Sequence, residues 1–178
     1  MNNEILAAIN NDKALKSLFS PYLSVFSKAK HCKVFDYGCG YGWGSAYLAG
    51  VSDLVVGYDV DCDRIRYAAS RYEGIGNLRF ISQLDLAQDD YFDIVVVSHV
   101  LNSSSDEELI AKEILSKINN GGRIIICAKT IYSQQLNGLI DQIRKMSVTE
   151  EETKADRSAE RFGRILISEM TVKEKKNV

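Results

Sequence analysis

A run of alternate glycines and the aspartate just before it carry the clearest chemical information in this chain of 178 residues. The run consists of Gly38, Gly40, Gly42 and Gly44, and Asp36 stands two positions before its first member. Glycine lets a backbone approach a ligand more closely than any side chain allows. An apolar strand, a glycine turn and a helix with free backbone N–H groups at its start form a nucleotide-binding βα unit. We therefore expect a nucleotide-like ligand at this turn.

Two further aspartates stand where such a ligand could reach them. Asp59 and Asp85 each follow an apolar segment of strand length. The carboxyl ends of parallel strands meet at one edge of a sheet, and ligands bind there. Each aspartate alone would suit a solvated surface position, but their placement at successive strand ends together with Asp36 favours a binding site. Residues 98–102 follow the β-branched run 94–97 and are expected at the same edge.

The glycine spacing and the nearby charges narrow the kind of ligand. A dinucleotide-binding turn has the pattern G-x-G-x-x-G, and its third glycine would fall at Trp43 or Ser45 here. No Gly-Lys-Ser/Thr follows the run, so a P-loop does not match either. No lysine or arginine occurs between Lys33 and Arg64, which is unfavourable for a polyphosphate. A cationic ligand without phosphate groups fits the acidic strand ends better.

Apolar runs of strand length alternate with segments of helical period along the chain. The expected strands are residues 33–37, 54–58, 78–81, 94–97, 123–128, 148–153 and 163–170. No helix-sized insertion separates the last two, which predicts an antiparallel hairpin at one edge. The sequence therefore predicts an α/β fold, with a Rossmann-like seven-stranded, mainly parallel sheet and helices on both faces.

The length suits a single domain over residues 1–178, with an N-terminal helical segment at 1–30 and the Rossmann-like core at 31–170. The N-terminal segment could cover a pocket or simply pack on the core, and Tyr22 and Phe26 are its available aromatic contacts. The lysine-rich residues 173–176 are expected to form a frayed tail.

Composition excludes few functions but disfavours several partners. The net charge of -2 and the pI of about 5.7 offer no general attraction for nucleic acid or an anionic membrane. The sequence shows no secretory leader and no apolar stretch long enough to cross a bilayer. Its four cysteines form no C-x-x-C pair, so we expect free thiols, no metal site and a cytoplasmic location.

An ordered set of short motifs resembles the class I S-adenosylmethionine-dependent methyltransferases. Each motif is common alone, but the order and spacing of the set are specific, and the resemblance covers roughly residues 30–130. The matching stretches are Asp36-x-Gly38-x-Gly40-x-Gly42, Gly57-Tyr58-Asp59-Val60, Leu84-Asp85-Leu86, Phe92-Asp93 and Gly121-Gly122-Arg123.

The resemblance implies S-adenosylmethionine as cofactor, S-adenosylhomocysteine as product, and roles for the matching residues. Asp36 would hold the ammonium of the methionine part or fix the glycine turn beside it. Asp59 would accept hydrogen bonds from both ribose hydroxyls, a task that suits a carboxylate. Asp85 would accept from the adenine amino group. The implied cofactor-binding residues are Asp36, Gly38, Cys39, Gly40, Gly42, Asp59, Val60, Asp85, Leu86 and Ser98.

Methyl transfer from a sulfonium is an in-line displacement, so positioning supplies much of the rate. A base is needed only where the acceptor must first lose a proton. His99 is the candidate catalytic residue, as a general base or an acceptor contact, and a structural or cofactor-contacting role is its alternative. Asn102 could orient an acceptor. The pocket could be shaped by Tyr37, Tyr41 and Trp43.

The stretch Ser98-His99-Val100-Leu101 departs from the Asn/Asp/Ser-Pro-Pro-aromatic motif of family members that methylate base amines. With the acidic pI, this departure favours methyl transfer to an O, N or C atom of a small molecule. Two alternatives stay open. One is a protein or RNA acceptor that contacts Arg157, Arg161, Arg164 and the lysine tail, and the other is a non-catalytic cofactor-binding subunit of a methyltransferase complex. The oligomeric state stays open as well.

Overall fold

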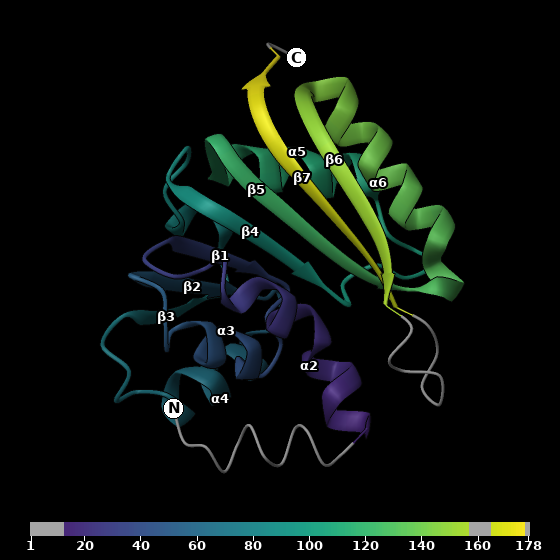
Figure 1. Cartoon of the computed structure of the whole chain (residues 1–178). Coiled ribbons are helices and arrows are strands. Elements are labelled where there is room, and N and C mark those ends of the chain that lie inside the picture. The colour runs from purple at the N-terminus through teal and green to yellow at the C-terminus, as the bar shows by residue number, and fades with distance from the viewer. Residues whose placement is uncertain (1–12, 157–164, 177–178) are drawn as a thin grey trace.

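The centre of the molecule is a seven-stranded sheet in the order β3-β2-β1-β4-β5-β7-β6 (Figure 1). The computed structural model describes residues 13–156 and 165–176. Strands β1 to β5 pair in parallel, and β7 runs antiparallel to both β5 and β6. The predicted fold class and C-terminal hairpin are confirmed. The strands are β1 (Lys33–Tyr37), β2 (Leu54–Tyr58), β3 (Leu78–Ile81), β4 (Phe92–Ser98), β5 (Ile118–Lys129), β6 (Ser147–Asp156) and β7 (Ile165–Lys175).

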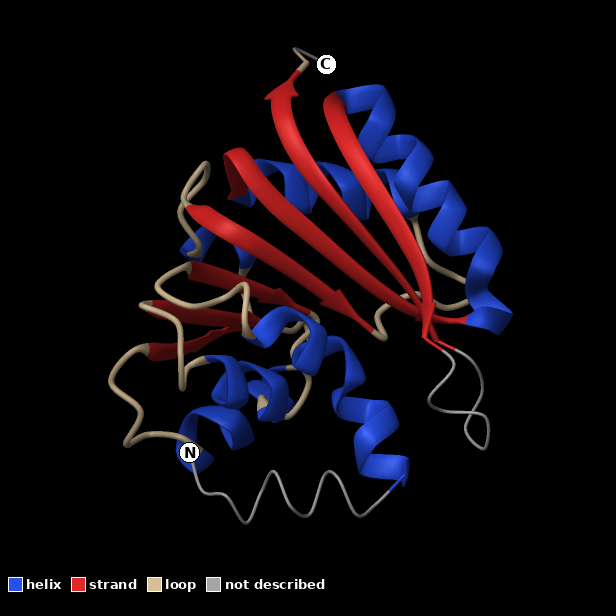
Figure 2. Cartoon of the chain, viewed as in Figure 1, coloured by secondary structure: helices blue, strands red, loops and turns tan. Residues whose placement is uncertain are grey.

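Helices cover both faces of this sheet (Figure 2). Side chains of α2 and α3 pack on one face, where α4 lies next to β3, and side chains of α5 and α6 pack on the other. No described helix is long and apolar enough to cross a membrane. The helices are α2 (Lys13–Phe26), α3 (Trp43–Leu48), α4 (Cys62–Arg71), α5 (Glu107–Lys117) and α6 (Ser133–Met146), with short 3-10 turns η1 (Leu84–Leu86) and η2 (Thr130–Tyr132).

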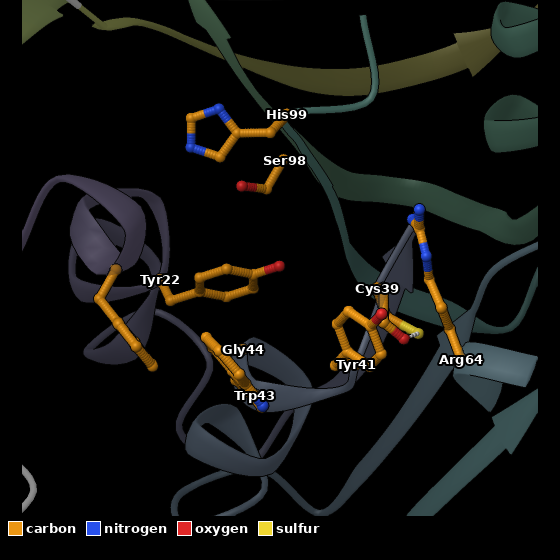
Figure 3. A pocket seen from close by; sticks show the side chains of 11 residues that line it. Tyr22, Cys39, Tyr41, Trp43, Gly44, Arg64, Ser98 and His99 are labelled. Carbon is orange, nitrogen blue, oxygen red and sulfur yellow. Dashed lines mark hydrogen bonds between the residues drawn. The ribbon is translucent and has the colours of Figure 1, made fainter. Parts of the chain in front are cut away.

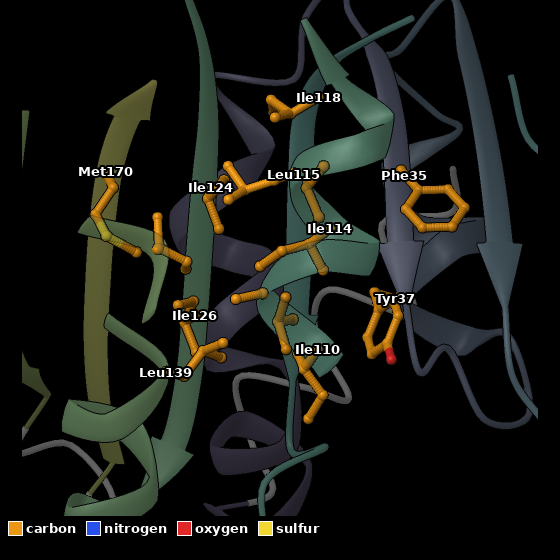
Figure 4. Close-up of a cluster of buried hydrophobic side chains, with 14 of the residues drawn as sticks. Phe35, Tyr37, Ile110, Ile114, Leu115, Ile118, Ile124, Ile126, Leu139 and Met170 are labelled. Carbon is orange, nitrogen blue, oxygen red and sulfur yellow. The ribbon is translucent and has the colours of Figure 1, made fainter. Parts of the chain in front are cut away.

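Strand β1 shows how the sheet sorts its side chains, because successive residues of a strand point to opposite faces. Val34 lies in the core under α2 and α3, and Phe35 and Tyr37 lie in the core under α5 (Figure 4). The Tyr37 hydroxyl donates a hydrogen bond to Glu113 of α5. The prediction that Tyr37 shapes the pocket is therefore wrong, since its ring faces away from the side on which Asp36 lies.

The two ends of the chain differ from their sequence expectations in different ways. Residues 13–26 are helical as predicted, whereas residues 1–12 lie outside the described part of the chain. Strand β7 continues to Lys175, and the backbone N–H of Lys176 donates to the Met146 carbonyl at 2.8 Å. The prediction of a frayed tail at residues 173–176 is wrong, because β6 stays paired with β7 as far as Lys175 and Val172 is buried just before it.

Candidate functional site

The turn after β1 reverses the chain through three glycines in the left-handed region. The φ angles of Gly38, Gly40 and Gly42 are 76°, 57° and 78°. The backbone N–H groups of Gly38 and Cys39 donate to the Tyr58 carbonyl at 2.7 and 2.8 Å, which ties the turn to the end of β2. Residues other than glycine rarely adopt these φ angles, so the alternate glycines allow the backbone to follow this turn.

The three glycines face different surroundings. A Cβ atom at Gly38 would overlap Val100, and one at Gly42 would lie 2.5 Å from the ring of Phe80. At Gly40 no atom of the described residues, apart from its neighbours in the chain, lies within 4 Å of the Cβ position. Gly38 and Gly42 therefore allow close packing within the protein, whereas Gly40 is where the backbone itself is open to a ligand.

A cavity of about 240 Å³ opens beside Gly40, between the glycine turn, the end of β4 and helix α2 (Figure 3). Of the candidate residues, the fold brings Gly38, Cys39, Gly40, Ser98 and His99 together here. The full lining consists of these five with Phe19, Tyr22, Tyr41, Trp43, Gly44 and Arg64. Tyr41 and Trp43 lie in the pocket wall as expected, whereas no sequence pattern pointed to Phe19 or Arg64.

Helix α2 supplies one wall of the cavity through Tyr22. Its side chain is buried, and a Cβ atom at Gly44 would overlap its ring. Its hydroxyl donates to Oδ1 of Asp36 at 3.2 Å, and the Ser45 hydroxyl donates to Oδ2 at 2.6 Å. Asp36 has no exposed surface and does not line the cavity. Its carboxylate joins α2 and α3 to β1. Of the two roles expected for Asp36, this arrangement favours holding the glycine turn in place rather than contacting a ligand directly.

Burial raises the pKa of Asp36 to about 6, although its hydrogen bonds from Ser45 and Tyr22 act in the opposite direction. The folded protein then holds this proton more tightly than the unfolded chain does. We therefore expect the free energy of unfolding to fall as the pH rises from about 4 to about 6, by about 3 kcal/mol for this group. Asp36→Asn should flatten that slope in urea unfolding measured across this range. A variant that keeps the wild-type slope would contradict the assignment.

Asp59 supports the turn from the end of β2. Its Oδ2 accepts from the Gly40 backbone N–H at 2.9 Å, and its Oδ1 accepts from that of Asp61 at 3.0 Å. The side chain of Asp59 is mostly buried. Each carboxylate oxygen can accept more than one hydrogen bond, so Asp59 retains capacity for two ligand hydroxyls. Its oxygens therefore have acceptor capacity left for a diol, although the side chain itself does not line the cavity.

The remaining candidates for the ring of a nucleoside lie outside the cavity wall. Val60, directly after Asp59, and Leu86 in η1 are 76% and 64% exposed, and Asp85 is also exposed. Exposed apolar side chains after two neighbouring strands could contact the faces of a flat ring, and a carboxylate between them could accept from an amino group. The fold thus leaves these three residues free for a ligand but does not enclose one.

His99 stands at the end of β4 in a strained position. Its φ angle is 59°, an uncommon value for a side chain of this size, and its backbone N–H donates to the Cys127 carbonyl at 3.0 Å. Both ring nitrogens are buried without a hydrogen-bond partner among the described residues. Burial, and secondarily the charge of Lys129, lower the pKa of His99. The neutral ring can therefore accept a proton or a hydrogen bond from a molecule in the cavity.

Asn102 is not brought into the cavity. Its side-chain oxygen accepts from the Ser104 backbone N–H at 2.8 Å, and its own backbone N–H donates to the Ser105 hydroxyl at 2.9 Å. These contacts form a local turn before α5, and the side chain is exposed. The expectation that Asn102 orients an acceptor has no support from this placement.

Comparison with known proteins adds independent information. Residues 28–175 match a family model described as a methyltransferase domain. An arsenite methyltransferase from Aquipseudomonas alcaligenes is 28% identical over 134 residues, which cover 66% of this chain and 37% of that protein. This chain thus spans well under half of that curated relative.

Solved structures show the same fold. The N-methyltransferase NodS from Bradyrhizobium japonicum, also known with S-adenosyl-l-homocysteine bound, superposes with a TM-score of 0.71 at 15% identity, and the match covers 89% of this chain and 96% of the unliganded one. A TehB-like SAM-dependent methyltransferase from Corynebacterium glutamicum has a TM-score of 0.67 at 22% identity, over 95% of this chain and 93% of that one.

Proposed function

Because the chain belongs to the methyltransferase domain family, we propose that it transfers a methyl group from S-adenosylmethionine to an O, N or C atom of a small molecule. The observation that carries this proposal is the open backbone of Gly40, which Asp59 holds beside a cavity that His99 also lines. The ring nitrogens of His99 have no hydrogen-bond partner among the described residues. We further propose a single domain over residues 1–178, with a helical segment at 1–30 and a core at 31–170.

The described residues fit this cofactor. Gly38, Cys39, Gly40 and Gly42 would lie along its methionine part, and Ser98 beside its sulfur. Asp59 would receive the ribose hydroxyls, while the exposed residues Val60, Asp85 and Leu86 would contact the adenine. Asp36 would act indirectly, because its oxygens already accept hydrogen bonds from the hydroxyls of Tyr22 and Ser45. When bound, S-adenosylmethionine supplies a methyl group on a positively charged sulfur.

The residues of the chain contribute mainly by positioning. The aromatic side chains of Phe19, Tyr22, Tyr41 and Trp43 line the cavity, where they can face a cation. Holding two reactants in line within such a site removes much of the entropic barrier to their reaction. His99 would take up a proton, at a ring nitrogen, from an acceptor that must lose one.

The direct test is calorimetric titration of the full chain with S-adenosylmethionine and with S-adenosylhomocysteine. We expect saturable binding of both at a single site. If neither compound binds, the proposed function is refuted. Turnover that appears only after a partner chain is added would instead identify a cofactor-binding subunit.

The role proposed for His99 has a pH signature. Because its pKa is lowered, the ring is neutral at pH 7, and a base-dependent rate should fall only below about pH 6.5. An NMR titration of the ring should give a midpoint below that pH. His99→Gln should lower kcat by about 100-fold or more, the size expected for loss of a general base, while S-adenosylhomocysteine binding is retained. An unchanged kcat would leave His99 a structural residue.

Other acceptors are less well supported. Arg157, Arg161 and Arg164, proposed contacts for a macromolecule, fall on residues outside the described part of the chain. Two of the three tail lysines are in ion pairs, since Lys173 pairs with Glu150 at 3.1 Å and Lys175 pairs with Asp90. The described residues contain no group of three or more His, Cys, Asp or Glu side chains that could hold a metal ion.

A further inference from the structure

Arg64 is held at the edge of the cavity by contacts that leave the outer side of its guanidinium free. Its backbone N–H donates to Oδ1 of Asp61 at 3.2 Å, and its Nε lies 3.1 Å from Oδ2 of the same carboxylate. Its guanidinium carbon lies 5.8 Å from the centre of the Tyr41 ring. The two terminal nitrogens donate no hydrogen bond to any residue that the structure describes. Arg64 is therefore preorganised, with a planar pair of donors still available.

Arg64 lies at the cavity, whereas a second arginine of the same helix does not. Arg66, two positions further along α4, pairs with Asp63 in the same i, i+3 pattern. Its side chain is 79% exposed and does not line the cavity. Arg64 does line it, across from Ser98 and His99 (Figure 3). The chain thus contains a matched pair of arginines, of which one faces the site.

Among the described residues, Asp61 is the carboxylate that pairs with Arg64, and this pair uses Nε rather than the two terminal nitrogens. Asp36 and Asp59 are close by, but both are buried and neither lines the cavity. In the proposed cofactor site the ribose belongs at Asp59, and the sugar carries no charge. Arg64 is tied to this end through Asp61, whose backbone N–H donates to Asp59 at 3.0 Å and whose carboxylate pairs with Arg64. We place the methionine carboxylate further along the glycine turn, towards Ser98, so that the guanidinium is available for a second molecule.

We propose that the acceptor is a planar small molecule that carries a carboxylate, and that Arg64 binds this carboxylate through its two terminal nitrogens. An arginine matches the two oxygens of a carboxylate with two parallel hydrogen bonds. The aromatic walls suit a flat ring, which would place its reacting group towards His99. This inference rests on the proposed function and adds the class of substrate to it.

The test uses the full chain saturated with S-adenosylhomocysteine and titrates it with matched probes by calorimetry. The probes are 2-, 3- and 4-hydroxybenzoate and the corresponding hydroxybenzamides, which have the same shape without the charge. We expect at least one of the acids to bind about tenfold or more tightly than its amide, as hydrogen bonds to a charged group allow. Arg64→Met should reduce that ratio to about one, and Arg64→Lys, which keeps a charge without the fork, should leave a smaller preference. Arg66→Met should leave the ratio unchanged.

Four results would overturn the inference. Acids and amides could bind equally to the wild-type protein, or none of them could bind. Arg66→Met could remove the preference as fully as Arg64→Met, which would show a general effect of charge. Arg64→Met could weaken binding of S-adenosylhomocysteine itself, which would make Arg64 a cofactor residue. Failure of the proposed function is distinguishable, because the wild-type protein would then not bind S-adenosylhomocysteine at all.

Discussion

Asp59→Ala is expected to weaken S-adenosylhomocysteine binding by about 100-fold or more, because two hydrogen bonds to a charged acceptor contribute about 3 kcal/mol or more together. The substitution removes the proposed ribose acceptor and also releases the backbone N–H of Gly40, which Asp59 holds at 2.9 Å. Both effects act on the same ligand, since Gly40 is the open position of the turn. Isothermal titration of the purified variant measures the loss directly.

The matched control is Asp63→Ala, which removes a carboxylate from the same region at a side chain that is 81% exposed. It should change the affinity for S-adenosylhomocysteine less than twofold. Asp59→Asn keeps one acceptor oxygen and should fall between the two. If Asp59→Ala bound S-adenosylhomocysteine with wild-type affinity, Asp59 would not be a cofactor-binding residue and would only support the glycine turn.

Gly44→Ala is expected to destabilise the protein by about 3 kcal/mol, at the upper end of the cost of overpacking a core. The new methyl group would overlap the ring of Tyr22, which cannot move away without losing its hydrogen bond to Asp36. Helix α2 would be pushed off α3, and the cavity would lose a wall. Urea unfolding of the variant measures the change in stability.

A second substitution distinguishes this overlap from a general effect of glycine loss. The double variant Tyr22→Ala with Gly44→Ala lacks the ring that causes the overlap. Its loss of stability should therefore be clearly smaller than the sum of the losses in the two single variants. Gly74→Ala is the control, because Gly74 is exposed and its Cβ position is free of contacts within 4 Å. Additive costs in the double variant would contradict the proposed contact.

Local patterns account for much of what could be predicted. The order of strands and helices follows from apolar periodicity, and the glycine turn follows from backbone freedom at Gly38, Gly40 and Gly42. The position of Asp59 at the end of β2 follows from the same pattern. The alternation of side chains along β1 also places Tyr37 away from Asp36, because neighbouring residues of a strand point to opposite faces.

The sequence by itself determined the α/β sheet, the glycine turn and the acidic residues at its strand ends, because these depend on residues close together in the chain. Only the tertiary structure decided which side chains share the cavity. Tyr22 meets Asp36 across 14 positions, and Gly40 meets Asp59 across 19. The partners that the described residues offer to His99 and Arg64 also depend on how separate elements pack. Hydrogen-bond partners and burial arise from contacts between distant segments, and local sequence patterns do not specify them.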